Sequence, residues 1–477
     1  MLGAAKEEMT VTTRAENFDM AYIYAISAVA ALGGLLFGYD WVVIGGAKPF
    51  YEKFFHLNDP SQQGWAMSCA LIGCLVGALV SGWLSDRFGR KRWLIAAGLV
   101  FAVSSIGTAL APSFAAFVPW RILGGFAIGM ASSLSPMYIA EVAPAQYRGK
   151  LVSLNQLTIV IGILLAQVVN WLIAKPVPAN ATSLQILQSW NGQVGWRWMF
   201  GVTAIPSMLF FVAMFVVPES PRWLAKKGAH ERAKHVLSRI GGESYGVQAL
   251  REIEATVTQD TKQTDLRMLL DRRMLRVLLL GIGLAVLQQW CGINVIFNYA
   301  EEVFSAAGYT VSDILFNIVV TGAVNLLFTF IAIGFVDRYG RRVLMLTGSA
   351  GLAMIYTCLG ALYYVHGHGV HMLVLVVAAI GCYAMSLAPV TWVIISEIFP
   401  NRIRGAAISV AVTSLWIASF ILTYTFPLFN HALGAAKTFW IYAGICVAGF
   451  FFIKARLPET KGKTLEQIEG LWSKRDP

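Results

Sequence analysis

The sequence predicts an all-α membrane protein with twelve transmembrane helices, and three features of its 477 residues support this fold class. The chain is 57% apolar and only 13% charged, so it has too little polar surface to cover a soluble body of this size. Its apolar residues gather in runs long enough to cross a bilayer. The two halves carry the same charged motifs in the same order, which predicts two pseudo-symmetric six-helix bundles.

Twelve apolar runs of about 20 residues account for the predicted helices, since the alternating pattern of membrane strands is absent. The first run should be a retained anchor, because no signal-cleavage site follows it. The runs are centred on residues 22–46, 64–84, 93–113, 117–140, 150–174, 198–217, 277–299, 314–336, 343–364, 372–396, 406–428 and 438–455. The expected layout is a tail (1–20), a six-helix bundle (21–217), a linker domain (218–275), a second six-helix bundle (276–456) and a tail (457–477).

The placement of positive charge predicts the orientation in the membrane. Of the 37 Lys and Arg residues, most fall in the tails and the even-numbered loops. The positive-inside rule therefore places both termini and the linker in the cytoplasm of a plasma or bacterial inner membrane. This asymmetry and contact with anionic lipid explain the net charge of +11, so no nucleic acid partner is expected. The exceptions are Lys48, Lys53, Lys175, Arg197 and Lys437 in odd-numbered loops and Arg121 within a span.

The charged motifs occur twice in the chain, once in each half. The segment GWLSDRFGRK at 82–91 returns as GFVDRYGRR at 334–342, and two further acidic motifs repeat in the same way. Such internal repeats are typical of transporters. The charges flank inner helix ends, where they can pair with one another or with helix termini and latch those ends together. Topology signalling alone could explain the arginines, but not the acids beside them. The expected gating residues are Asp86, Arg87, Arg90, Glu141, Arg148, Glu219, Asp337, Arg341, Glu397, Arg404 and Glu459.

Within the linker, residues 229–239 and 246–257 place apolar side chains at helical spacing among charges, which predicts short cytoplasmic helices over the inner mouth. No cofactor or metal is expected. The six cysteines lie in apolar spans without CxxC spacing or histidine partners, and the outer histidines His366, His368 and His371 are better explained as a solvated loop cluster. An enzyme is not expected either, since no nucleophile, metal cluster or phosphate loop is present.

Five motifs resemble the sugar porter family of the major facilitator superfamily, over about residues 20 to 470. They are FGYD at 37–40, RILGG at 121–125, PESPRWL at 218–224, QQ with GIN at 288–294, and PETKGKTLE at 458–466. The chain is most similar to bacterial proton-linked monosaccharide symporters of the xylose and galactose type. The resemblance implies the major facilitator fold, alternating access, a monosaccharide substrate and a protein that functions as a monomer.

Asp40 and Arg121 are ionisable residues inside apolar spans, where an unpaired charge is costly. A change in their separation would change the proton affinity of the carboxyl group, as a proton-coupling pair requires. A static buried ion pair that fixes helix register is the alternative. We favour coupling, because passive facilitators that resemble this chain typically carry Asn in place of Asp40.

A monosaccharide site needs amides that donate and accept hydrogen bonds and aromatic rings that stack on the sugar. Span seven offers four amides, whose arc near 220° is too wide for one face of a straight helix, so a break at Gly292 is predicted. The alternative is that these amides hydrogen-bond neighbouring helices. The expected ligands are Gln288, Gln289, Asn294 and Asn298 from span seven, Phe37 one turn from the acid, and, implied by the resemblance, Gln156, Asn325, Trp392 and Trp416.

Three departures from the family pattern leave the choice among pentoses, hexoses and cyclitols open: Trp41-Val42, Phe297-Asn298 and Leu415-Trp416. The expected function is proton-coupled import of a monosaccharide. A passive facilitator and a non-transporting sugar sensor are the alternatives.

Overall fold

The computed structural model describes residues 18–178, 181–260, 271–305, 308–367, 369–399 and 404–461. Within these ranges every regular element is a helix, and eleven helical stretches are long and apolar enough to cross a membrane. The last of them, Ala406–Arg456, leaves helical geometry at Gly434, where φ is 78°, so it consists of two helices. The all-helical fold class is confirmed, and the helices are consistent with the twelve predicted spans.

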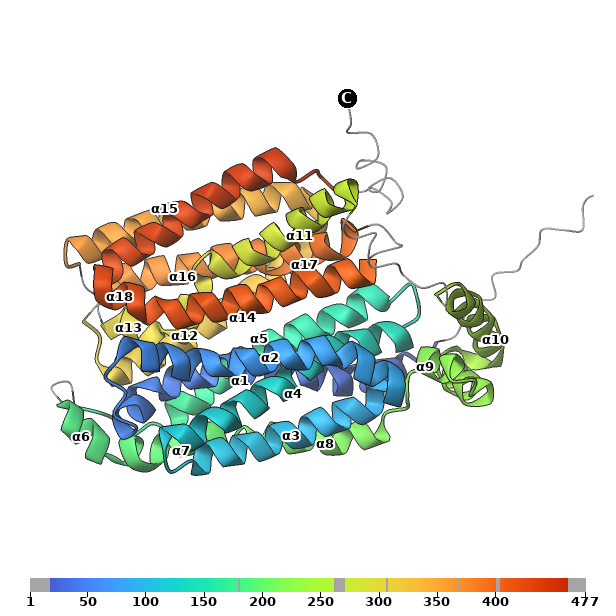
Figure 1. The fold of residues 1–477 in the computed structure, drawn as a ribbon, viewed down its shortest axis with the longest axis horizontal. Coiled ribbons are helices and arrows are strands. Elements are labelled where there is room, and N and C mark those ends of the chain that lie inside the picture. Colours follow the sequence, from blue (N-terminus) through green and yellow to red (C-terminus); the bar gives the residue numbers. More distant parts are fainter. Residues whose placement is uncertain are drawn as a thin grey trace, which may run out of the picture.

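The first half of the chain forms the lower group of helices in Figure 1, coloured blue to green. Its sixth pass is assembled from a π-helical turn and two helices, which a turn at Val202 and Thr203 separates. The elements are α1 (Met20–Phe54), α2 (Pro60–Phe88), α3 (Arg90–Leu110), α4 (Phe114–Val142), α5 (Arg148–Ile173), the short α6 (Ser183–Gln188), the π-helical turn η1 (Asn191–Gly195), α7 (Trp196–Gly201) and α8 (Ala204–Val216).

The second half lies beside the first, in yellow-green to red (Figure 1). The elements are α11 (Arg272–Trp290), α12 (Ile293–Asn298), α13 (Ala300–Ser305), α14 (Val311–Tyr339), α15 (Arg341–Tyr364), α16 (Val370–Met385), α17 (Leu387–Glu397) and α18 (Arg404–Arg456). Helix α2 packs against the last long helix, α18, and α5 packs against α14, the helix that begins at Val311, so each of these pairs joins the halves.

The linker between the halves contains α9 (Pro221–Lys226) and α10 (His230–Asp260). Helix α10 is broken at Gly241 and Gly242, so the two linker helices predicted at 229–239 and 246–257 are confirmed. Both elements lie at one end of the molecule (Figure 1), which we call the inner end; the opposite end, near α13, is the outer end. Most of the two predicted tails and His368 lie outside the described residues.

Close backbone contact holds the first half together. A Cβ atom on Gly38 of α1 would overlap the carbonyl oxygen of Ile159 on α5, and one on Gly125 of α4 would overlap the carbonyl oxygen of Ala70 on α2. Between membrane helices, where lipid is as apolar as a side chain, such close approach gains van der Waals contact that larger residues would prevent. Helix α1 is thereby fixed against α5, with Asp40 just beyond Gly38.

One expectation about the first span is wrong. The apolar run ends near residue 46, and Lys48 and Lys53 were therefore expected in an outer loop, but α1 continues to Phe54. Lys48 is only 2% exposed. The helix can continue because carboxylates of α1 and α13 surround the Lys48 ammonium group, so the charge that suggested a loop is compensated within the fold.

Candidate functional site

Asp40 and Arg121 form a buried ion pair within the first half. Oδ1 of Asp40 on α1 lies 2.5 Å from Nη1 of Arg121 on α4, and the two residues are 5% and 4% exposed. The guanidinium group also lies 5.3 Å from the centre of the Phe200 ring, in cation–π geometry. The two charges that the sequence singled out thus meet, although 81 positions separate them.

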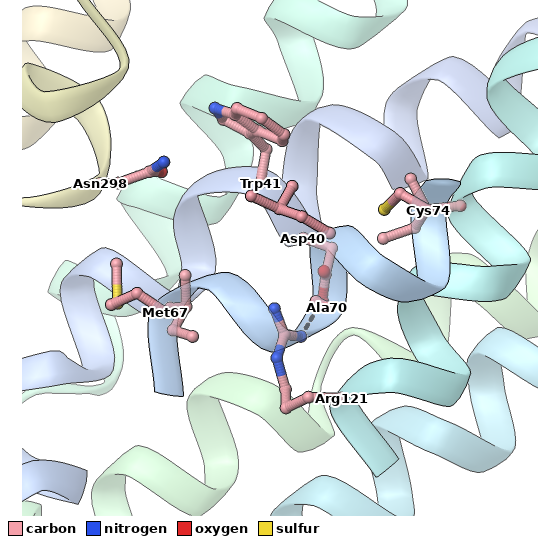
Figure 2. A pocket seen from close by; sticks show the side chains of 10 residues that line it. Asp40, Trp41, Met67, Ala70, Cys74, Arg121 and Asn298 are labelled. Carbon is pink, nitrogen blue, oxygen red and sulfur yellow. Dashed lines mark hydrogen bonds and ion pairs between the residues drawn. The ribbon is translucent and has the colours of Figure 1, made fainter. Parts of the chain in front are cut away.

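A small cavity of about 20 Å³, enough for about one water molecule, adjoins this pair. Asp40, Trp41 and Arg121 line it from the first half, and Asn298 reaches it from α12 of the second half (Figure 2). Oδ1 of Asn298 is buried and has no hydrogen-bond partner among the described residues. The cavity therefore brings a neutral amide with a free acceptor to the charged pair. The remaining lining residues are Ile44, Met67, Ala70, Leu71, Cys74 and Ile128.

The predicted break in span seven is confirmed at Gly292. Helix α11 ends at Trp290, Gly292 adopts the left-handed conformation with φ of 88°, and α12 begins at Ile293. A side chain would be strained at this φ and would also meet the ring of Tyr442, so glycine is required here. The chain turns at this point and presents amides from both sides of the break.

Three of the four amides of this region form a hydrogen-bonded chain. Nδ2 of Asn294 donates to Oε1 of Gln289 at 2.5 Å, and Nε2 of Gln289 donates to Oε1 of Gln288 at 3.3 Å. Gln288 in turn donates to the carbonyl oxygen of Ala388 on α17. All three amides are less than 8% exposed. The structure thus joins these three and assigns Asn298 to the separate cavity beside Asp40.

The predicted aromatic ligands divide into two groups. Phe37 lies 5.9 Å from Trp416 of α18, between ring centres, and Trp41 packs against both rings at 5.7 Å and 6.2 Å. This aromatic cluster (Phe37, Trp41 and Trp416) crosses from one half to the other, and its member Trp41 lines the cavity. Trp392 of α17 does not join it and is 41% exposed. Sequence reasoning noted Trp41 as a departure from the family pattern but missed it as a site residue.

The remaining predicted amides lie on the helices that join the halves. Gln156 on α5 is half-buried, and Asn325 on α14 is 6% exposed. Sequence reasoning missed Gln167, which lies on α5, three turns after Gln156. It is 1% exposed, neither of its amide atoms has a hydrogen-bond partner among the described residues, and its Oε1 points at Gly322 of α14. A buried amide without partners costs free energy unless a ligand satisfies it.

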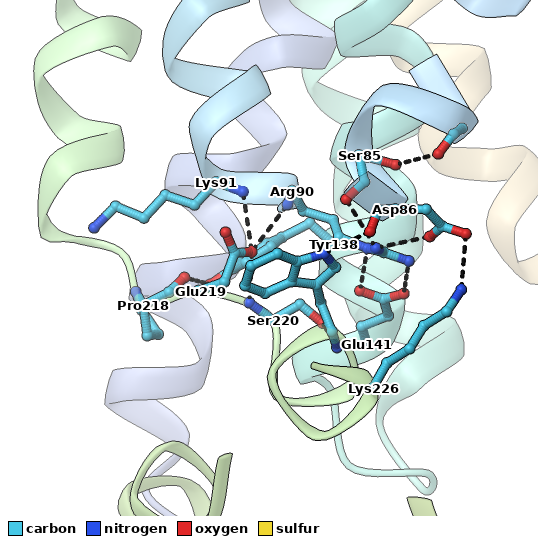
Figure 3. Close-up of polar contacts among 12 residues, drawn as sticks. Ser85, Asp86, Arg90, Lys91, Tyr138, Glu141, Pro218, Glu219, Ser220 and Lys226 are labelled. Atoms are coloured by element: carbon cyan, nitrogen blue, oxygen red, sulfur yellow. Dashed lines mark hydrogen bonds and ion pairs between the residues drawn. The ribbon is translucent and has the colours of Figure 1, made fainter. Parts of the chain in front are cut away.

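At the inner end, the first set of gating candidates forms one network (Figure 3). Nε of Arg90 lies 3.0 Å from Oε2 of Glu141, and Nη1 of Arg90 lies 2.9 Å from Oδ1 of Asp86. Lys226 of α9 pairs with the same aspartate at 2.9 Å. Oε1 of Glu219 accepts hydrogen bonds from the backbone N–H groups of residues 90 and 91, which begin α3. These pairs lie within the first half and its linker.

The second half repeats the arrangement. Glu459 accepts hydrogen bonds from the backbone N–H groups of residues 341 and 342, which begin α15, and Nη2 of Arg341 lies 3.2 Å from Oε1 of Glu397. Arg87 and Arg148 are exposed, with Arg87 over the Trp83 and Phe88 rings. The side chains of Asp337 and Arg404 lie outside the described part of the chain. The repeated sequence motif is therefore also a repeated local structure. The hydrogen bonds and ion pairs named here for each half join groups of that same half and its adjoining linker or tail.

Comparisons with known proteins agree with one another. The family model described as "Sugar (and other) transporter" matches residues 26–472. The D-xylose-proton symporter of Escherichia coli K12 and the arabinose-proton symporter of Bacillus subtilis 168 are each 39% identical, over 96% of this chain and 97% of each relative. The solved inward open conformation of the Escherichia coli xylose transporter has a TM-score of 0.82 at 37% identity, over 94% of this chain and 100% of that chain.

Proposed function

Because this chain belongs to the sugar transporter family of the major facilitator superfamily, we propose that it imports a monosaccharide together with protons, by alternating access between its two halves. The relatives named above supply the substrate class, a pentose or hexose. The protein acts as a multi-pass protein of the plasma membrane, with both termini and the linker helices in the cytoplasm and with no need for a second subunit.

The observation that carries this proposal is the contact between a buried charge pair and a cavity shared by both halves. Asp40 and Arg121 line that cavity from one half, and Asn298 lines it from the other. Any rearrangement of the halves changes the surroundings of the carboxyl group and hence its affinity for a proton. Asp40 and Arg121 therefore act as the proton-coupling pair.

The sugar contacts come from both halves as well. Gln288, Gln289 and Asn294 supply amides from α11 and α12, and Gln167 supplies an unpartnered amide from α5. The aromatic cluster offers apolar faces to the sugar ring. Of the other residues predicted from sequence, Gln156, Asn325 and Trp392 stay candidates on α5, α14 and α17. A ligand held by both halves favours an occluded state, which is what alternating access requires.

The inner charge networks set the barrier between states. In the second half Glu397 and Glu459, and in the first Glu141 and Glu219, fix neighbouring helix ends so that each half moves as a unit. Closure of the inner end brings the two networks toward each other.

Uptake of labelled monosaccharides into proteoliposomes tests the function. With an acidic exterior, we expect accumulation of at least one pentose or hexose above the external concentration, and loss of that accumulation when a protonophore is added. Equilibration without accumulation would identify a passive facilitator. Failure of every monosaccharide in the panel to enter would reject the substrate class.

A further inference from the structure

Four charged side chains meet at the outer end, where a helix of the first half touches a helix of the second. Nζ of Lys48 on α1 lies 2.5 Å from Oε1 of Glu302 and 3.5 Å from Oε2 of Glu301, both on α13. It also lies 3.1 Å from Oε2 of Glu52, one turn further along α1. We call Lys48, Glu52, Glu301 and Glu302 the outer charge cluster. Two of the three carboxylates belong to the other half, so the cluster ties the halves together.

The cluster carries more negative than positive charge. Three ionised carboxylates around one ammonium group would leave two net negative charges in a site where the Lys48 side chain is 3% exposed and the side chains of Glu52, Glu302 and Glu301 are 12%, 20% and 23% exposed. Oε1 of Glu52 and Oε2 of Glu302 are buried and have no hydrogen-bond partner among the described residues. Like charges in a site that is largely shielded from water are unfavourable, and the unpartnered carboxylate oxygens add to the cost. One bound proton relieves both penalties.

Glu302 is the most favourable acceptor, because its Oε2 is buried without a hydrogen-bond partner among the described residues and because two other carboxylates share its site. Burial raises the pKa of Glu302 to about 8; Lys48 opposes this rise, and the charges of Glu301 and Glu52 add to it. This carboxyl group lies on α13, beyond the membrane-spanning stretch that ends at Asn298.

The other polar groups around the cluster do not offer an exchangeable proton. The hydroxyl group of Tyr299, whose ring centre lies 5.8 Å from the Lys48 Nζ, donates to the carbonyl oxygen of Thr423. Tyr51 on α1 donates to the sulfur of Met67. The positive charge of Lys53, on the same helix, attracts the carboxylate of Glu52. Arg121 on α4 is already paired with Asp40. The exchangeable proton therefore belongs to a carboxyl group of the cluster.

Movement of the halves would divide the cluster unequally. Lys48 and Glu52 lie one turn apart on α1 and would stay together, whereas Glu301 and Glu302 would move away with α13. Water would then reach the two carboxyl groups. On the basis of the alternating access proposed above, we propose that the outer charge cluster is a second proton-binding site, which holds one proton while the outer end is closed and releases it when the outer end opens.

In the release step the O–H bond of one carboxyl group breaks, the carboxyl group becomes a carboxylate, and the proton passes to water as hydronium. The closed state has the higher proton affinity, so a falling pH favours closure. The effect acts between about pH 8 and the ordinary carboxyl pKa of about 4.3, and it changes the ratio of closed to open states by up to tenfold for each pH unit.

Distances between spin labels on the two halves test this proposal. We would label Gln62→Cys on α2 and His371→Cys on α16, both exposed, after replacing the exposed cysteine (Cys358→Ser). The Asp40→Asn background removes the first proton site, so any remaining pH dependence has another source. The measurement needs no sugar and no gradient, and sugar exchange by the same protein reports separately whether the proposed transport function holds.

We expect the population with the shorter label distance to grow at least tenfold between pH 8 and pH 5. Glu302→Gln, which mimics the protonated acid, should remove most of this change and leave the short distance dominant at both pH values. Lys48→Met should instead lower the short-distance population at pH 8, since three carboxylates then face one another without compensation.

Asp59→Asn is the matched control, because this exposed outer carboxylate lies outside the cluster, and it should leave the pH response unchanged. A pH response that persists at full size in Glu302→Gln, Glu301→Gln and Glu52→Gln would overturn the proposal, as would a parent protein whose label distances do not depend on pH.

Discussion

Oδ1 of Asp40 lies 2.5 Å from Nη1 of Arg121, and this pair is closed off from bulk water on α1 and α4. A buried pair of this kind is weak evidence for stability, because desolvation offsets most of the attraction. Such a pair can instead couple movement to protonation, because separating the two groups removes the attraction that keeps the carboxyl group ionised. The contact between the pair and the cavity favours a role in proton coupling over a role in stability.

Asp40→Asn removes the group that gains and loses a proton but keeps nearly the same volume. We expect proton-driven accumulation of sugar to be lost, while exchange of labelled for unlabelled sugar across the membrane, which needs no net proton movement, is retained. Both are measured in proteoliposomes, with Asp59→Asn as the control that should behave like the parent. Accumulation at the parent level in Asp40→Asn would contradict the assignment of this residue.

Gln167→Ala should weaken sugar binding without weakening the fold. The amide has no hydrogen-bond partner to lose among the described residues, so its removal leaves no new unsatisfied group in the free protein. If the amide contacts sugar, the loss corresponds to about 1–3 kcal/mol, or roughly a 5- to 150-fold rise in Kd. Binding is measured by calorimetry, and thermal stability in detergent by a melting curve.

Gln156→Ala provides the comparison for this test, because both residues lie on α5 and only Gln156 was predicted from the sequence. A larger loss of binding in Gln156→Ala than in Gln167→Ala would show that the sequence-based choice was the better one.

The contrast between these two amides shows where the sequence was informative. The break at Gly292 could be predicted, because four amides in one span cannot share a face of a straight helix. The choice between Gln156 and Gln167 could not, because it depends on which residue of α5 lies opposite a glycine of α14, here Gly322. The pairing of α5 with α14 is a contact between halves that no local pattern encodes.

The burial of Lys48 could not be predicted from the sequence. A lysine after an apolar run ordinarily indicates that the span has ended, and for this reason the sequence predicts a loop there. The compensating carboxylates, Glu301 and Glu302, lie about 250 positions further along the chain and become neighbours only when the two halves pack. In contrast, Glu219 and Glu459 could be predicted as a related pair, because the sequence around them repeats.

Trp41→Ala should broaden the choice of sugar. The indole group lines the cavity beside Asp40 and packs against Phe37 and Trp416, so its loss enlarges the cavity and removes a contact from each of these rings. We expect the ratio of uptake rates between the preferred sugar and a sugar that differs by one hydroxymethyl group to fall by about tenfold, corresponding to roughly 1.4 kcal/mol for the lost packing.

Competition uptake assays measure this ratio. Trp171→Ala serves as the control, because this tryptophan is 41% exposed and packs against Phe316, away from the cavity. An unchanged ratio in Trp41→Ala would show that the aromatic cluster does not select the sugar.

Gly89 and Gly340 should be the positions in the repeated motif that tolerate substitution least. Each has a positive φ, 105° and 89°, and the carboxylate of Glu219 or Glu459 occupies the place of a Cβ atom. Alanine would strain the backbone by about 1–3 kcal/mol, because both glycines combine a positive φ with a ψ of 156°. It would also displace the carboxylate that accepts hydrogen bonds from the first turn of the next helix, a cap worth about 1 kcal/mol. We expect Gly89→Ala and Gly340→Ala each to lower the melting temperature in detergent by several degrees.

The same motif supplies the matched controls. Gly82 and Gly334 open the two copies and lie within α2 and α14, and a Cβ atom at either position would have no neighbouring atom within 4 Å. Since alanine is favoured over glycine in a helix by about 1 kcal/mol, Gly82→Ala and Gly334→Ala should leave the melting temperature unchanged or raise it. Equal destabilisation by all four substitutions would mean that the glycines matter through helix packing. A loss confined to Gly89→Ala and Gly340→Ala would instead tie stability to the carboxylate-capped turns, which both halves build in the same way.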